Sequence, residues 1–118
     1  MHELSVTEAL LNTASDYAKR QNANKVTVLN IIIGKLSGII DDSVQFYWDI
    51  IAKETIFEGS RLNFTIIPAK FECQNCQHQF EMEDELIPCP RCQSMDLLTI
   101  QGDEFLLESI EIEKDINE

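Results

Sequence analysis

The sequence predicts an α+β fold in which two helices pack on a three-stranded sheet and a cysteine-containing segment is inserted before the last strand. Apolar residues recur at helical spacing in two stretches, 10–18 and 44–51. Three other stretches are rich in β-branched residues or alternate between apolar and polar residues, as strands do: 26–33, 62–66 and 105–113. All four cysteines lie between residues 73 and 92, which sets that segment apart. The 118 residues suit one domain with a small appendage.

The first predicted helix begins at Ser5. Ser5 and Glu8 match the S-x-x-E capping box, in which each side chain accepts a hydrogen bond from the other residue's backbone amide. Apolar residues then fall on one face: Leu10, Leu11, Ala14, Tyr17 and Ala18. Lys19 and Arg20 suit the C-terminal turn, where cations complement the helix dipole. This start leaves Met1-His2-Glu3 as a short arm ahead of the helix.

The first predicted strand covers residues 26–33. It is rich in β-branched side chains and stops at Gly34, which indicates burial on both faces. We expect residues 34–38 to form a loop.

The second predicted helix begins near Asp41 and Asp42, either of which can cap it. Asp42 with Gln45 also resembles a capping box. Its apolar stripe is wide and rich in aromatic residues, which we assign to the core rather than to a ligand site: Val44, Phe46, Tyr47, Trp48, Ile50 and Ile51.

Two further strands complete the predicted sheet. In residues 62–66 apolar and polar side chains alternate, and Pro68 should end this strand or place it at an edge. The last strand covers residues 105–113. Leu106, Ile110 and Ile112 are expected on one face, and Glu108 interrupts the alternation, which suggests a bulge.

The net charge of −12 is unevenly distributed along the chain. Residues 1–70 contain seven basic and eight acidic residues, whereas residues 71–118 contain two and thirteen. Such an acidic half repels a phosphate backbone, so nucleic acid is not an expected partner. The sequence shows neither a signal peptide nor a membrane span, so we expect no membrane association and a cytoplasmic location.

The four cysteines form two C-x-x-C motifs, Cys73–Cys76 and Cys89–Cys92, separated by twelve residues. Two such turns can point four sulfurs at one centre, which predicts a structural Zn²⁺ site with tetrahedral geometry. Disulfides, a rubredoxin-like iron centre and a catalytic dithiol are the alternatives. His78 could replace one sulfur, although with four thiolates present we expect it to be exposed. A closed four-sulfur site has no position for a substrate.

The N-terminal arm offers a different donor set. The α-amine, the His2 amide and the His2 imidazole can close fused chelate rings, and the Glu3 amide can complete a plane of nitrogens. Planar nitrogen donors suit Ni²⁺ or Cu²⁺ better than Zn²⁺. The alternative is a histidine without function near a frayed terminus, with Glu3 complementing the helix dipole.

The combination of these features resembles the HypA/HybF family of hydrogenase nickel-incorporation proteins. The resemblance rests on the opening Met-His-Glu-Leu-Ser, the paired C-x-x-C motifs, Gly34 after the first strand and the closing segment from Gly102 to Ile112, and it covers essentially the whole chain. It implies a nickel metallochaperone that binds Ni²⁺ through His2 and Glu3 and holds Zn²⁺ at Cys73, Cys76, Cys89 and Cys92. In some members an acidic residue before the second helix completes the nickel site, which here would be Asp41 or Asp42.

The resemblance also implies partners and a domain organisation. A HypB-type GTPase and the [NiFe]-hydrogenase large subunit are the expected partners, with urease accessory proteins in some organisms. We expect a nickel-binding α/β domain from residues 1–70 together with 103–118, and a zinc-ribbon domain from residues 71–102.

Two other classes of function compete with this interpretation. A zinc-ribbon adaptor for protein or nucleic-acid complexes would need a basic ribbon face, which the acidic second half does not offer. An enzyme would need a nucleophile with a base, a phosphate loop or an open metal site, and His2 is the only credible general base. We therefore expect no catalytic activity.

Overall fold

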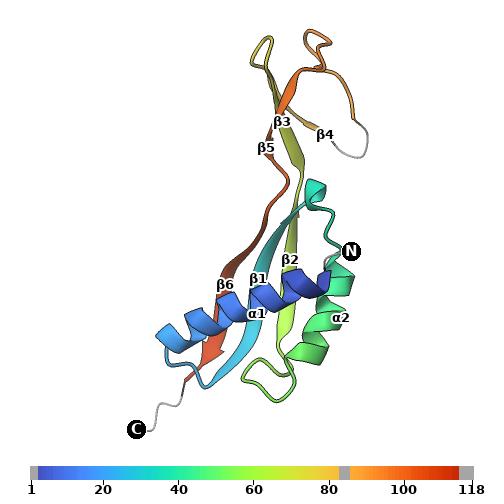
Figure 1. Ribbon diagram of the computed structural model, residues 1–118. Helices are drawn as coiled ribbons and strands as arrows, with labels where there is room; N and C mark the ends of the chain where they lie inside the picture. Colours follow the sequence, from blue (N-terminus) through green and yellow to red (C-terminus); the bar gives the residue numbers. More distant parts are fainter. Residues whose placement is uncertain (1–2, 83–85, 115–118) are drawn as a thin grey trace. The chain divides into compact units, whose positions relative to one another are not determined.

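The computed structural model describes residues 3–82 and 86–114. Figure 1 shows the elements in chain order: α1 (Glu3–Arg20), β1 (Lys25–Gly34), a 3₁₀ turn (Lys35–Ser37), α2 (Asp41–Ile51), β2 (Arg61–Ile67), β3 (Ala69–Cys73), β4 (Gln79–Met82), β5 (Leu97–Gln101) and β6 (Phe105–Glu113). The contacts divide the described residues into two compact units. The first contains residues up to Ile32, Ile39–Thr65 and those from Leu106 onward; the second contains Ile33–Gly38 and Ile66–Phe105.

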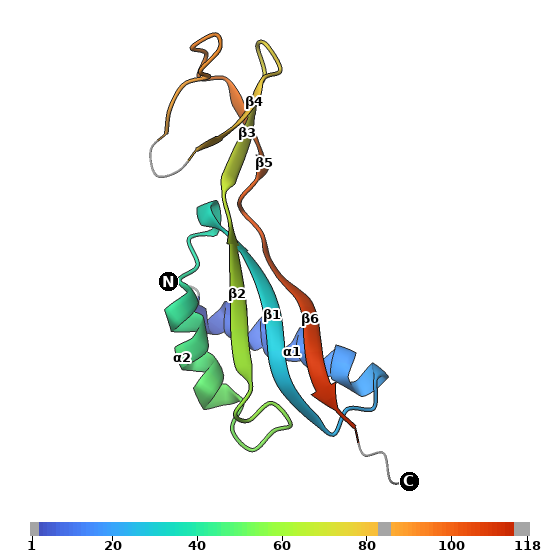
Figure 2. The same cartoon turned by 180° about the vertical axis from the view of Figure 1, so that it is seen from behind.

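The first unit contains the predicted three-stranded sheet, with the strand order β2-β1-β6. Lys25 Nζ donates to the Glu58 carbonyl, and Asn63 Nδ2 donates to Asn30 Oδ1. Both contacts join residues that are 33 positions apart in the sequence, and a constant separation of this kind indicates parallel strands. The chain therefore crosses from β1 through α2 to β2. Asn24 N–H donates to the Glu113 carbonyl at 2.8 Å, so β6 runs antiparallel to β1. Figure 2 shows these directions from behind.

The core of the first unit lies between the sheet and the two helices. Its fully buried side chains come from both helices, β1 and the loop after α2: Ala14, Val26, Leu29, Ile31, Val44, Trp48 and Phe57. The Trp48 and Phe57 rings pack edge to face at 5.5 Å, and Trp48 Nε1–H donates to Ser60 Oγ at 2.8 Å. The expected core role of Trp48 is confirmed. Phe46 and Ile50 are 60% and 51% exposed, so their assignment to the core was wrong.

The start of α1 and the capping residue of α2 differ from the prediction. Glu3 already belongs to α1, and Ser5 is an exposed helical residue rather than the cap. The Thr7 hydroxyl donates to the Glu3 carbonyl one turn earlier, so residues 3–7 already form a helical turn where the capping box was predicted to begin the helix. The N-cap of α2 is Ile40, without a side-chain cap, and Asp41 and Asp42 lie in the first turn. There their charges complement the helix dipole.

The second unit is a small three-stranded sheet with the order β4-β3-β5 and antiparallel pairing. One face buries Ala69, Phe71 and Met82, with Phe80 and Leu97 partly buried beside them. No strand was predicted in this segment, because each strand is short and is defined by its pairing with the others. Pro68 separates β2 from β3, as predicted.

The chain closes tightly where β1 ends. Gly34 N–H donates to the Glu104 carbonyl at 2.8 Å, and Leu36 N–H donates to the Gly102 carbonyl. A Cβ on Gly34 would lie 2.0 Å from the Gly102 oxygen, so only glycine fits there. None of the helices in the described part of the chain is both long and apolar enough to span a membrane.

Candidate metal centres

The two cysteine motifs form turns with the same hydrogen-bond pattern. In the first, Cys73 N–H donates to the His78 carbonyl and Gln77 N–H donates back to the Cys73 carbonyl, both at 2.8 Å. In the second, Cys89 pairs with Ser94 and Gln93 in the same way, at 2.9 and 2.8 Å. Gln77 and Gln93 both adopt a φ of 64°, the left-handed conformation that lets each turn reverse. The repeated geometry directs both cysteines of each motif to one side.

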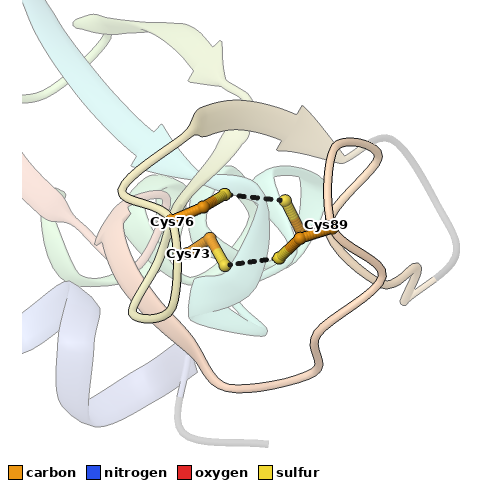
Figure 3. Close-up of side chains that lie close together, drawn as sticks. Cys73, Cys76 and Cys89 are labelled. Carbon is orange, nitrogen blue, oxygen red and sulfur yellow. Dashed lines mark hydrogen bonds between the residues drawn. The ribbon is translucent and has the colours of Figure 1, made fainter.

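The four sulfurs converge on one point. All lie within 4.8 Å of one another, with Cys73 and Cys92 3.5 Å apart and Cys76 and Cys89 3.7 Å apart. Figure 3 shows Cys73 and Cys76 on one loop facing Cys89 on the other. Four sulfurs around a Zn²⁺ at 2.3 Å would be separated by about 3.8 Å along each edge. The arrangement fits a tetrahedral cage, and it is too open for a disulfide, whose S–S bond is about 2.05 Å.

The surroundings lower the pKa of the Cys89 and Cys92 thiols, whereas burial and the neighbouring thiols raise the pKa of Cys76 to about 12. Asn75 Nδ2 lies 3.5 Å from the Cys92 sulfur, and this hydrogen bond lowers the pKa of the Cys92 thiol to about 6. Arg91 N–H donates to the Cys89 sulfur at 3.4 Å. Cys73 and Cys89 are fully buried, so their charges need a cation to compensate for lost hydration. Asn75 was not predicted as part of the site, although its place inside the first C-x-x-C motif was a usable signal.

His78 is separate from this cluster. Its carbonyl helps to form the first turn, and its ring stacks on Phe80 with centroids 5.9 Å apart. The residue is half-buried, not exposed as expected, because the Phe80 ring covers one side of the imidazole.

Of the two expected nickel ligands, the structure describes Glu3, the first residue of α1. His2 falls outside the described residues, whereas Glu3 is 5% exposed. Glu3 Oε2 accepts a hydrogen bond from Ile40 N–H at 3.1 Å, so the carboxylate holds the amide that precedes α2. This contact was not predicted, because nothing in the sequence pairs residues 3 and 40. Asp41 Oδ1 accepts a hydrogen bond from Asp42 N–H at 2.8 Å.

A family model described as "Hydrogenase/urease nickel incorporation, metallochaperone, hypA" matches residues 1–112. The chain belongs to the HypA family. Among curated HypA relatives, the hydrogenase maturation factor of Dehalococcoides mccartyi strain BAV1 is 42% identical over 113 residues, covering 96% of this chain and 95% of that protein. The factor of Caldanaerobacter subterraneus is 41% identical over 114 residues, covering 96% and 100%.

Solved HypA structures share the fold. The solution structure of the nickel metallochaperone HypA from Helicobacter pylori superimposes with a TM-score of 0.71 at 25% identity, covering 98% of this chain and all of that one. A second HypA solution structure gives a TM-score of 0.73 at 24% identity. The predicted fold class, with two helices, small sheets and clustered cysteines, is therefore confirmed.

Proposed function

We propose that this protein is a nickel metallochaperone for hydrogenase maturation, which binds Ni²⁺ at its N-terminus and passes it to the [NiFe]-hydrogenase large subunit. The observation that carries the proposal is the family match across residues 1–112, which includes both the opening Met-His-Glu and the four-cysteine cluster. The relatives at 41–42% identity are named hydrogenase maturation factors.

The cysteine cluster is proposed to hold a permanent Zn²⁺. Cys73, Cys76, Cys89 and Cys92 supply four sulfurs at tetrahedral spacing, a donor set typical of structural zinc. Among the described residues, the core cluster of the second unit's sheet contains three buried apolar side chains, so metal binding would supply much of the unit's folding free energy. Four thiolates leave no open coordination position. The cluster therefore supports a structural role and no catalysis.

The cargo site is proposed at His2 and Glu3. The α-amine, the His2 amide, the His2 imidazole and the Glu3 amide form a planar nitrogen set, which Ni²⁺ favours. The Glu3 carboxylate already accepts a hydrogen bond from Ile40 N–H, so we assign the contribution of Glu3 to its backbone nitrogen. A site with few ligands at a chain end can release its metal, as a carrier requires.

The proposed partners follow from the family. A HypB-type GTPase would assist delivery to the hydrogenase large subunit, with urease accessory proteins as a second class of recipient. We propose a cytoplasmic location. The net charge of −12 argues against nucleic acid and against the alternative of a nucleic-acid adaptor.

The proposal is tested by titrating Ni²⁺ into zinc-loaded protein that begins with its natural first residue. Wild type should bind one Ni²⁺ and give the absorption bands of a planar diamagnetic complex. His2→Ala should lose this binding and keep its zinc and helix content. The matched control is His78→Ala, which removes the other histidine and should leave nickel binding unchanged.

Delivery is tested separately, by incubating the nickel-loaded protein with the metal-free hydrogenase large subunit and a HypB-type GTPase. Nickel should appear in the large subunit at a rate that depends on His2. Transfer from His2→Ala at the wild-type rate would contradict the proposed route.

A further inference from the structure

Helix α1 is longer than the sheet that it covers is wide. Its 18 residues extend about 27 Å, whereas three strands spaced about 4.8 Å apart occupy about 14 Å. Figures 1 and 2 show α1 running across the strands, with its C-terminal end extending past β6. The last turn of α1 therefore projects beyond the edge of the sheet.

A groove lies under this projecting turn. It measures about 460 Å³ and is lined on the helix by Tyr17, Arg20 and Gln21, and on the edge strand by Glu108, Ser109 and Ile110. Tyr17 is 42% exposed, and the Arg20 guanidinium lies 5.7 Å from the centroid of its ring. The strand order ends at β6 among the described residues, so one backbone edge of β6 borders the groove. An added strand would place its helix-facing side chains against Tyr17.

The two faces of β6 differ in chemistry. Asn30 Nδ2 donates to Ser109 Oγ at 2.9 Å, and the neighbours of Asn30 on β1, Leu29 and Ile31, are buried under the helices. Ser109 therefore lies on the face away from the helices. Because side chains alternate along a strand, the exposed Glu111 and Glu113 share that face, whereas Ile110 and Ile112 face the helix side.

We propose that β6 pairs with an extended segment of a partner protein in which basic and apolar residues alternate. The apolar residues would lie in the groove beside Tyr17 and Ile110, and the basic residues would lie opposite Glu111 and Glu113. Backbone hydrogen bonds to the free edge would provide affinity, and the alternation would provide specificity. A second copy of β6 is a poor occupant, since antiparallel self-pairing brings like charges together.

The experiment uses the ¹⁵N-labelled, zinc-loaded full chain and a synthetic peptide of the same length as β6 in which lysine and valine alternate. Amide signals should shift at Glu108, Ser109 and Ile110 and in the last turn of α1. The same peptide with methylated backbone amides keeps its charges but lacks hydrogen-bond donors, and it should bind at least tenfold more weakly.

Paired variants separate local recognition from overall charge. Glu111→Lys with Glu113→Lys should weaken peptide binding at least tenfold. Glu8→Lys with Asp49→Lys makes the same change in net charge at exposed positions in α1 and α2, and should have little effect. The proposal is overturned if the lysine–valine peptide causes no shifts, if the methylated peptide binds equally well, if the shifts centre on the second unit, or if the chain dimerises through β6.

Discussion

Two residues far apart in the sequence connect the two helix starts of the first unit. The Glu3 carboxylate accepts a hydrogen bond from Ile40 N–H, the amide that precedes α2, and the Thr7 hydroxyl binds the Glu3 carbonyl. Glu3 thus holds the residue that precedes α2, although it belongs to α1. This contact constrains the residue that immediately follows the proposed nickel ligand His2.

Substitutions at Glu3 should separate its structural role from metal binding. Glu3→Ala should lower the free energy of unfolding by about 1–2 kcal/mol, because the Ile40 amide loses its acceptor. Glu3→Gln keeps an acceptor oxygen and should retain most of that stability and its nickel affinity. Urea unfolding and nickel titration measure the two effects. A large loss of nickel affinity in stable Glu3→Gln would identify the carboxylate as a ligand.

The buried pair of Trp48 and Ser60 should also be measurable. Trp48→Phe leaves the Ser60 hydroxyl, itself only 5% exposed, without its indole donor and should reduce stability by about 1–3 kcal/mol. In Trp48→Phe/Ser60→Ala the loss should be smaller than the sum of the two single changes. Additive losses, measured by urea unfolding, would show that the hydrogen bond contributes little.

At the scale of elements, local residue patterns predicted the main sheet and both helices. The β-branched run of residues 26–33 became β1. Leu29, Ile31 and Ile33 are buried, whereas Val28, Asn30 and Ile32 are half-buried, so the expected burial holds fully for one face only. The predicted helix caps were wrong, because the residues at a helix start depend on tertiary contacts, such as that between Glu3 and Ile40. The assignment of Phe46 and Ile50 to the core was wrong, because a stripe of apolar residues does not reveal how much of the helix its neighbours cover.

The second unit shows the same division between local and tertiary information. The spacing of the cysteines predicted their convergence, because each C-x-x-C turn is defined by its own backbone hydrogen bonds. Strands β3, β4 and β5 were not predicted, since their identity depends on pairing across residues 69–101 rather than on any local pattern.

The contact between Gly34 and Gly102 gives a prediction at this scale. Gly34 has ordinary extended backbone angles, φ −80° and ψ 144°, so Gly34→Ala tests steric fit alone. Its Cβ would lie 2.0 Å from the Gly102 oxygen, and we expect a loss of about 3 kcal/mol. The control is Gly38→Ala, which meets no atom within 4 Å but has a φ of 75° and should cost about 1–2 kcal/mol. Equal losses in urea unfolding would contradict the steric argument.

At the scale of the whole molecule, each unit has its own source of stability. The first unit buries a large apolar core that includes Trp48 and Phe57, whereas the second has a small core and the cysteine cluster. Loss of the metal should therefore affect the units unequally.

Hydrogen exchange with and without a zinc chelator checks this expectation. After metal removal, amides in β3, β4 and β5 should lose protection, whereas those in β1 should keep most of it, because none of the four cysteines lies in the first unit. Cys73→Ala should reproduce the pattern without a chelator. Simultaneous loss of protection in β1 and β3 would mean that the chain unfolds as one cooperative body.

The insertion of the second unit between β2 and β6 affects how the protein folds. Residues 68–104 connect β2 to β6, and when unstructured this connection of about 37 residues costs about 3 kcal/mol to close. When the cysteine turns are already formed, the ends of the connection are held closer and the barrier to docking β6 falls. With zinc at the cysteine cluster, as proposed, a shortage of zinc would slow the folding of this metallochaperone, so that the supply of one metal would limit the delivery of another.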